Sequence, residues 1–147
     1  MKISTVLFLA GLLAIQVPLA VNAVELKVVV NSLSNAEGKV YLRVWDSEKT
    51  WLKTQADMIR AEKVISADAQ NSDRKLEHSF DLPAGEYAVA VFHDIDGDGE
   101  LKTNFMGRPV EPIGNTARKQ GRMGPPKYED SVIVLGDELK ILNITLR

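Results

Sequence analysis

Hydrophobic and polar residues alternate along most of this chain, in short stretches rich in β-branched and aromatic residues. Residues 39–46 alternate most regularly, with Val40, Leu42 and Val44 on one side of an extended backbone. Further strands are predicted in the same way over residues 24–30, 74–82, 87–93, 131–135 and 139–146. Short strands separated by turn residues, with hardly any helix, predict a single antiparallel β-sandwich of about seven strands, the architecture of Ig-like domains.

Two segments in the first half of the chain are less regular. Residues 47–57 predict a loop or a short helical turn, with Trp51 and Leu52 packed inward. The composition of residues 58–67 allows a helix, but apolar residues at alternate positions also permit a strand. The β context on both sides favours the strand.

Residues 94–130 form a long Gly/Pro-rich loop in which no strand is predicted. Loops of this length without strands of their own are uncommon and are usually functional or disordered. The composition is not that of an ordinary disordered segment. Its apolar residues are expected to pin the loop to the sandwich: Phe105, Met106, Ile113, Met123 and Tyr128.

The N-terminus predicts an export signal. Lys2 gives a positively charged start, residues 3–15 are apolar apart from two hydroxyl residues, and small side chains precede a cleavage point after Ala23. We therefore expect a signal peptide over residues 1–23 and a β-sandwich domain over residues 24–147, periplasmic or secreted, with no membrane insertion after the signal is cleaved. A membrane anchor is the alternative, but the uninterrupted apolar stretch is shorter than the about 20 residues that a membrane span needs.

Composition narrows the classes of function. The 147 residues include 18 Lys and Arg against 20 Asp and Glu, a formal net charge of −2, which is not the basic balance of a nucleic-acid-binding domain. The chain has no Cys, so disulfides and a lipid-modified N-terminal Cys are excluded, and no zinc-ligand spacing occurs. The domain must hold together by its hydrophobic core, alone or with a bound ion.

The most specific motif is the run DIDGDG, which follows the predicted strand over residues 87–93. Asp94, Asp96 and Asp98 fall at positions 1, 3 and 5 of an EF-hand-type calcium loop, and Gly99 falls at position 6, where the chain turns sharply. Carboxylates at alternate positions repel one another unless a cation lies between them, and calcium takes about six to eight oxygen ligands. We therefore expect a cation site on a β scaffold, with Ca²⁺ as the candidate cofactor.

The second half of the calcium pattern is missing. Leu101, at position 8, is expected to point into the core, but position 9 is Lys102 and position 12 is Phe105 rather than the usual bidentate Glu. Further ligands are expected from Glu100, Asn104 and Glu111. Asp and Gly are also common in turns, so a metal-free turn between strands is the alternative.

Three stretches carry a resemblance to a known family: LPAGEYAVAVFHD (residues 82–94), GRPVEPIG (residues 107–114) and GPPKYED (residues 124–130). With the Asp/Gly loop between the first two, the chain resembles the bacterial domain of unknown function 2141 over essentially all of its exported part. The resemblance implies a small exported β-sandwich, transthyretin-like or carboxypeptidase-regulatory-like, and brings no established activity. That family often reads D-x-N-x-N-G-x-L-D, whereas this chain has Asp96 and Asp98 in place of Asn, and Lys102 in place of Asp.

The long loop is basic as well as rich in Gly and Pro. Its cations are candidate contacts for an anion or for a protein or glycan partner: Arg108, Arg118, Lys119 and Arg122. The alternative is a solvated loop whose cations balance the aspartates. Glu111, between Val110 and Pro112, is expected to bind the metal or to pair with Arg108.

His93 is expected to be packed or hydrogen-bonded at the strand end rather than catalytic, because the chain has no Cys and no G-x-S-x-G motif. We thus expect an exported, non-catalytic binding or accessory module whose cation site orders residues 94–130. Two alternatives are a hydrolase that uses the metal or His93, and a carrier of a small apolar ligand between the sheets.

Overall fold

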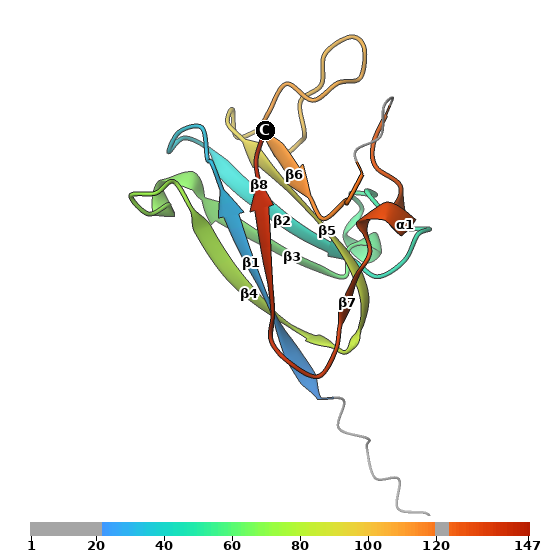
Figure 1. Cartoon of the computed structure of the whole chain (residues 1–147). Helices are drawn as coiled ribbons and strands as arrows, with labels where there is room; N and C mark the ends of the chain where they lie inside the picture. Colours follow the sequence, from blue (N-terminus) through green and yellow to red (C-terminus); the bar gives the residue numbers. More distant parts are fainter. Residues whose placement is uncertain (1–21, 120–123) are drawn as a thin grey trace, which may run out of the picture.

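The computed structural model describes residues 22–119 and 124–147 (Figure 1). In these residues the alternating stretches form strands: β1 Ala23–Asn31, β2 Lys39–Trp45, β3 Ala61–Ser66, β4 Leu76–Pro83, β5 Gly85–Asp94, β6 Ile113–Asn115, β7 Ile133–Leu135 and β8 Lys140–Thr145. One short helix, α1, spans Tyr128–Ser131, and two 3-10 turns span Ala56–Met58 and Ala67–Ala69. The strand expected within residues 58–67 is confirmed as β3.

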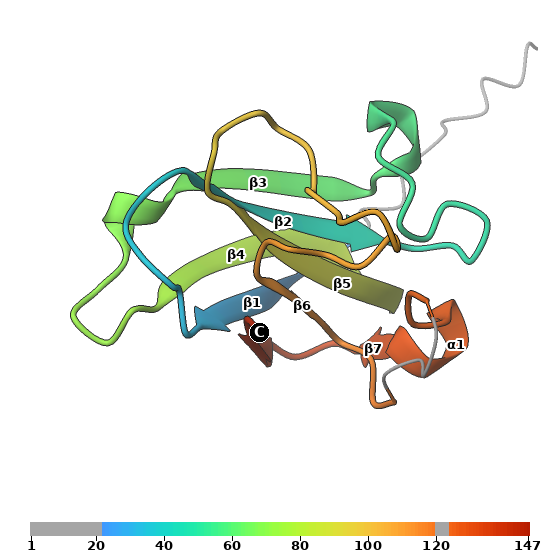
Figure 2. The ribbon, with the colours of Figure 1, turned by 90° about the horizontal axis from the view of Figure 1, so that it is seen from above.

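The strands form two sheets. One sheet has the order β4-β1-β8, and the other has the order β3-β2-β5-β6 with β7 also paired to β5. The pairs are antiparallel except β1 with β8, which run parallel. Seen from above, the sheets lie as two layers (Figure 2), which confirms the all-β sandwich.

The core lies between the sheets and is built from the inward positions of the alternating pattern. Val40, Leu42 and Val44, predicted to share one face of a strand, are fully buried. The core includes residues of the other strands: Leu26, Val28, Val30, Leu76, Phe80, Leu82, Val89, Val91 and Ile144. Removal of this apolar surface from water is the main favourable term in folding.

The long loop, predicted to hold no strand, contains β6 and α1. β6 is three residues long with a glycine at its centre, so it has no alternation of apolar and polar residues from which a strand could be predicted. Gly114 is needed because a Cβ there would lie 2.5 Å from Cγ2 of Ile144 on the facing sheet. The N–H groups of Ile113 and Arg147 each donate to the other's carbonyl oxygen, at 3.1 and 3.0 Å. β6 therefore joins the edge of one sheet to the end of the other.

Trp51 anchors the later part of the long loop. Its indole Nε1 donates to the carbonyl oxygen of Pro126 at 2.8 Å. Its ring packs edge-on against Trp45 and Tyr128, with centroids 5.1 and 6.1 Å apart. This aromatic cluster joins the loop after β2 to the start of α1 and leaves the earlier part of the long loop free to project.

Candidate cation site

β5 ends at Asp94, whose fully buried carboxylate organises the loop that follows. Its Oδ1 accepts the N–H of Gly97 at 2.8 Å, and its Oδ2 accepts the N–H of Gly99 at 3.0 Å. Gly97 and Gly99 have φ of 78° and 84°, values that an L side chain adopts only at a cost. The Asp/Gly spacing thus produces a tight turn wrapped around one carboxylate.

Glu111 closes the other side of this turn. It is 6% exposed, and its Oε1 accepts the N–H of Ile95 at 2.8 Å while its Oε2 accepts the N–H of Lys102 at 3.0 Å. These partners lie 16 and 9 residues before it in the chain. The buried carboxylate of Glu111 therefore joins the end of β5, at Ile95, to the base of the segment that projects from the sandwich, at Lys102 (Figure 1).

Three of the predicted ligands come together. Asp94, Asp96 and Glu111 each bring one carboxylate oxygen to within 4.8 Å of the others, and only Asp96 is exposed. A carboxylate has about four lone-pair sites, so Asp94 and Glu111 keep acceptor capacity beside the N–H groups they already bind. The donor set, all hard oxygen, fits the ligand preference of calcium.

Lys102 brings a positive charge into this group. Its Nζ lies 2.7 Å from Oδ2 of Asp96. The hydrogen bond to Asp96 and the charge of that carboxylate raise the pKa of Lys102, and the hydrogen bond from Lys102 lowers the pKa of Asp96. Both side chains are largely exposed, so the pair itself adds little to stability. The ion pair matters for metal binding, because a metal ion would have to displace this ammonium from Asp96.

The other predicted ligands lie outside this group. Oδ1 of Asp98 accepts the N–H of Glu100 at 2.8 Å, and both side chains are exposed. Asn104 lies further out, where its Oδ1 accepts the N–H groups of Met106 and Arg108 at 2.9 and 3.0 Å. The fold therefore brings together half of the predicted ligand set.

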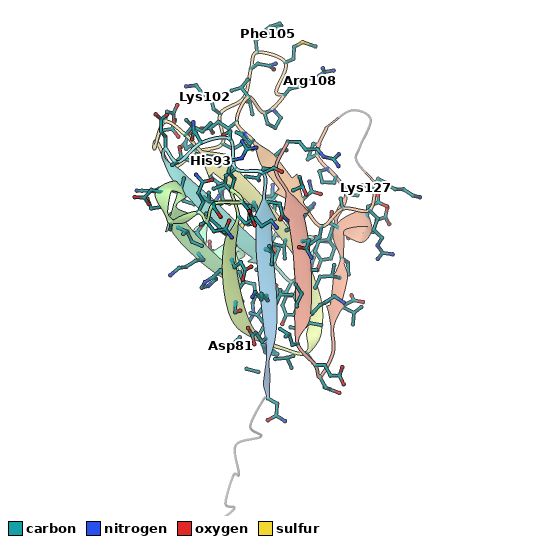
Figure 3. The ribbon with its side chains drawn as sticks, turned by 60° about the vertical axis from the view of Figure 1, so that its left-hand side comes forward. Asp81, His93, Lys102, Phe105, Arg108 and Lys127 are labelled. Carbon is teal, nitrogen blue, oxygen red and sulfur yellow. The ribbon has the colours of Figure 1, made fainter. Side chains whose placement is uncertain are left out.

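Residues 101–110 form a projecting hairpin (Figure 3). Phe105 is 97% exposed and Met106 is 62% exposed, so the expectation that they pin the loop to the sandwich is wrong. Leu101, expected to point into the core, is 38% exposed. The reason is that Glu111 holds the base of the hairpin at the end of β5, and the chain between turns away from both sheets.

The predicted anion contacts lie on different elements. Arg108 is exposed on the hairpin, whereas Arg118 donates from Nη2 to the carbonyl oxygen of Val132 at 3.2 Å. Lys119 is exposed beside Arg118. Arg122 lies outside the described residues, as does Met123 of the apolar set. Arg108 is thus the predicted anion contact that the hairpin carries.

His93 is fully buried, and both its ring nitrogens have partners. Nε2 lies 2.7 Å from the carbonyl oxygen of Glu37, which can only accept, so Nε2 carries the proton. Nδ1 lies 3.3 Å from the hydroxyl oxygen of Ser34, within hydrogen-bond distance. His93 fastens the turn after β1 to the end of β5, in agreement with the expected packed and hydrogen-bonded role.

Two neighbours of the site gave no signal in the sequence. Gly38 has φ of 71°, and a Cβ there would lie 1.9 Å from the carbonyl oxygen of Asp94. The Tyr41 hydroxyl lies 3.5 Å from the Cβ position of Gly99, and its pKa is raised by burial and then by the charge of Asp94. The Tyr41 ring stacks on Phe92 at 4.7 Å. Both neighbours belong to the β2 side, far from the loop in sequence, so no local pattern could reveal them.

The model of a family described as an uncharacterized protein conserved in bacteria, DUF2141, matches residues 28–142. The chain belongs to the DUF2141 family. No match was found among curated proteins or among solved structures.

The DUF2141 match begins in β1 and ends in β8, so it includes both sheets, the three acidic residues and the hairpin. In the described part of this DUF2141 protein, no helix is long and apolar enough to cross a membrane. Residues 1–21 of the predicted signal peptide lie outside the described residues.

Proposed function

We propose that this DUF2141 protein is an exported, non-catalytic binding or accessory module that presents the hairpin of residues 101–110 to a partner. The observation that supports this is the use of two buried carboxylates, Asp94 and Glu111, to hold an exposed segment. Burial of a charged group is costly unless it is hydrogen-bonded. Here Asp94 shapes the turn that leads into the hairpin, and Glu111 holds the base of the hairpin through Lys102. The sandwich is the support and the hairpin is the contact surface, for which a protein or a glycan is the expected partner.

The second part of the proposal is a divalent cation, Ca²⁺ first, bound by Asp94, Asp96 and Glu111. The oxygens of these three side chains are close enough to share an ion. Lys102 already neutralises Asp96, so the ion competes with a tethered ammonium. We therefore expect weak and reversible binding, with a dissociation constant on the order of 0.1–1 mM, as in extracellular calcium modules. The role of the ion is to order residues 94–111.

Thermal unfolding of residues 24–147 in chelator, in 10 mM calcium and in 10 mM magnesium tests the cation. A ligand that binds only the folded state at about ten times its dissociation constant stabilises by about 1.4 kcal/mol, which raises the midpoint by a few degrees. Asp96→Asn should remove this rise, because Asp96 is exposed and its loss leaves the core intact. Asp98→Asn, outside the three-residue group, should keep it. Equal midpoints in all three solutions would exclude the cation but leave the hairpin as a contact surface.

The contacts of His93 and the packing between the sheets favour neither a His93-based hydrolase nor a carrier of a small apolar ligand. A hydrolase based on His93 needs a free ring nitrogen, and both nitrogens of this buried ring are engaged. A carrier needs space between the sheets, where buried apolar side chains pack together instead.

A further inference from the structure

The tip of the hairpin is apolar and firmly held. The Asn104 N–H donates to the carbonyl oxygen of Arg108 at 2.8 Å, and the Val110 N–H donates to that of Lys102 at 3.0 Å. The Asn104 side chain also accepts two N–H groups of the turn. The backbone therefore keeps its shape without help from the side chain of Phe105, which is 97% exposed. Nothing in the fold of the hairpin requires a large apolar side chain at this position.

Apolar exposure continues along the hairpin. Met106 beside Phe105 is 62% exposed, Val110 on the returning strand is 56% exposed, and Leu101 at the base is 38% exposed. Single exposed apolar residues are common on protein surfaces, but contiguous exposed ones mark sites of contact with partners or membranes. These four side chains lie on one ten-residue projection.

Charge on the projection is arranged by depth. Residues 101–110 contain two cations, Lys102 and Arg108, and no acidic residue. Figure 3 shows Phe105 at the outer end, with Arg108 and Lys102 between it and the body of the protein. The acidic residues lie at the base, where Lys102 already pairs with Asp96. From the tip inward the order is apolar, cationic and then acidic.

This order matches the surface of an anionic membrane, where acyl chains lie beneath a layer of negative head groups. Aromatic and thioether side chains partition into that boundary, and Lys and Arg beside them bind head groups. The tip is convex, because Phe105 stands at the outer end of a projecting turn (Figure 3). A convex apolar tip fits a soft surface better than the cleft-and-ridge contact of a folded protein.

We propose that the hairpin tip of this DUF2141 protein binds anionic phospholipid surfaces, with Phe105 and Met106 inserted at the head-group boundary and Arg108 on a lipid phosphate. The inference rests on the proposed function of the hairpin as a contact surface, and it assigns a phospholipid surface as the ligand in place of the protein or glycan expected there. Two apolar side chains and one cation give weak, reversible attachment rather than permanent anchoring.

The test is co-sedimentation of residues 24–147 with vesicles of phosphatidylglycerol and phosphatidylcholine, and with phosphatidylcholine alone. Residues 1–23 are left out because their apolar stretch would itself bind lipid, and the core cluster lies entirely within the remaining chain. We expect binding to the anionic vesicles that weakens as salt is raised, and little binding to the neutral ones. No binding to the anionic vesicles would overturn the proposal and leave a protein or glycan as the ligand.

Variants distinguish insertion of the hairpin tip from nonspecific hydrophobic binding to the vesicles. Phe105→Ala with Met106→Ala should lower partitioning at least about tenfold, and Arg108→Gln about fivefold on anionic vesicles only. The matched control is Leu139→Ala with Ile141→Ala, which removes two apolar side chains of 52% and 54% exposure elsewhere. Equal loss in the control pair would overturn the proposal.

A fluorescent reporter at the tip gives a second readout. In Phe105→Trp, a blue shift of emission on adding anionic vesicles should exceed that of the unmodified protein, whose Trp45 and Trp51 pack against each other. An unchanged spectrum with bound vesicles would place the lipid contact elsewhere and overturn the assignment. Thermal midpoints of the same variants, with and without calcium, report separately on the cation and on folding, so that failure of either proposal can be told from failure of the other.

Discussion

The ammonium of Lys102 lies 2.7 Å from Oδ2 of Asp96, so the chain supplies its own cation to the acidic turn after β5. The backbone N–H of the same lysine donates to Oε2 of Glu111. Lys102 therefore contacts two members of the three-carboxylate group through different atoms. The turn can keep its shape without a metal, and an added metal ion would compete with the Lys102 ammonium for the carboxylate of Asp96.

Replacement of Lys102 by Met should strengthen the calcium response. The backbone N–H to Glu111 is retained, while Asp96 loses its competing ammonium. We expect a larger rise of the unfolding midpoint in calcium than the unmodified protein shows, and a slightly lower midpoint in chelator. Lys119→Met, on an exposed residue outside the acidic group, is the control. A calcium response in Lys102→Met equal to that of the control would mean that the ammonium does not guard the site.

Replacement of Glu111 by Gln should destabilise the base of the hairpin. Both carboxylate oxygens accept backbone N–H groups, and an amide places a donor against one of them. A buried N–H left without a partner costs about 1–3 kcal/mol, which urea unfolding can measure. Hydrogen exchange of the Ile95 and Lys102 amides should quicken. Glu100→Gln, on the exposed side of the turn, should leave both measurements unchanged, and a similar loss there would argue against a special role of Glu111.

Replacement of Gly38 by Ala should be among the most damaging single changes near the site. A Cβ would overlap the carbonyl oxygen of Asp94 at 1.9 Å, so the turn after β1 and the end of β5 would have to separate. We expect a loss of about 3 kcal/mol or more. Gly97 has a similar positive φ but no atom within 4 Å of its Cβ position, so Gly97→Ala should cost only the backbone strain, about 1–2 kcal/mol. If chemical denaturation gave equal losses of unfolding free energy for Gly38→Ala and Gly97→Ala, the close approach of Gly38 to the Asp94 carbonyl would be contradicted.

The contribution of Asp96 should depend on pH in a defined direction. Its hydrogen bond from Lys102 lowers its folded-state pKa below the usual 3.8, so the folded state favours the ionised form. The stabilisation is therefore complete above about pH 4 and is lost as the pH falls through the lower, folded-state value. The difference in midpoint between the unmodified protein and Asp96→Asn should be small, constant at neutral pH and smaller near pH 2. If the midpoint difference between the unmodified protein and Asp96→Asn grew on acidification, the lowered pKa of Asp96 would be contradicted.

Local regularity explains what could be predicted from the sequence. Alternation at period two reports which residues share one face of a strand, so the grouping of Val40, Leu42 and Val44 on one face of β2 followed directly from residues 39–46. The turn around Asp94 was also predictable, because Asp94, Gly97 and Gly99 lie within six residues of one another. The sandwich architecture was predictable as well, because it requires only strands of the right length and spacing along the chain.

Tertiary structure decided the remainder, because it depends on contacts between residues far apart along the chain. Whether Glu111 reaches Ile95 depends on the path of the hairpin between them, which no short pattern encodes. The same path leaves Phe105 in solvent, although its apolar side chain alone predicted burial. The sequence by itself thus determined the strands other than β6, and the acidic turn. The fold determined which carboxylates meet, which cation they meet and which apolar residues face outward, since side-chain distances follow only once the sheets have packed.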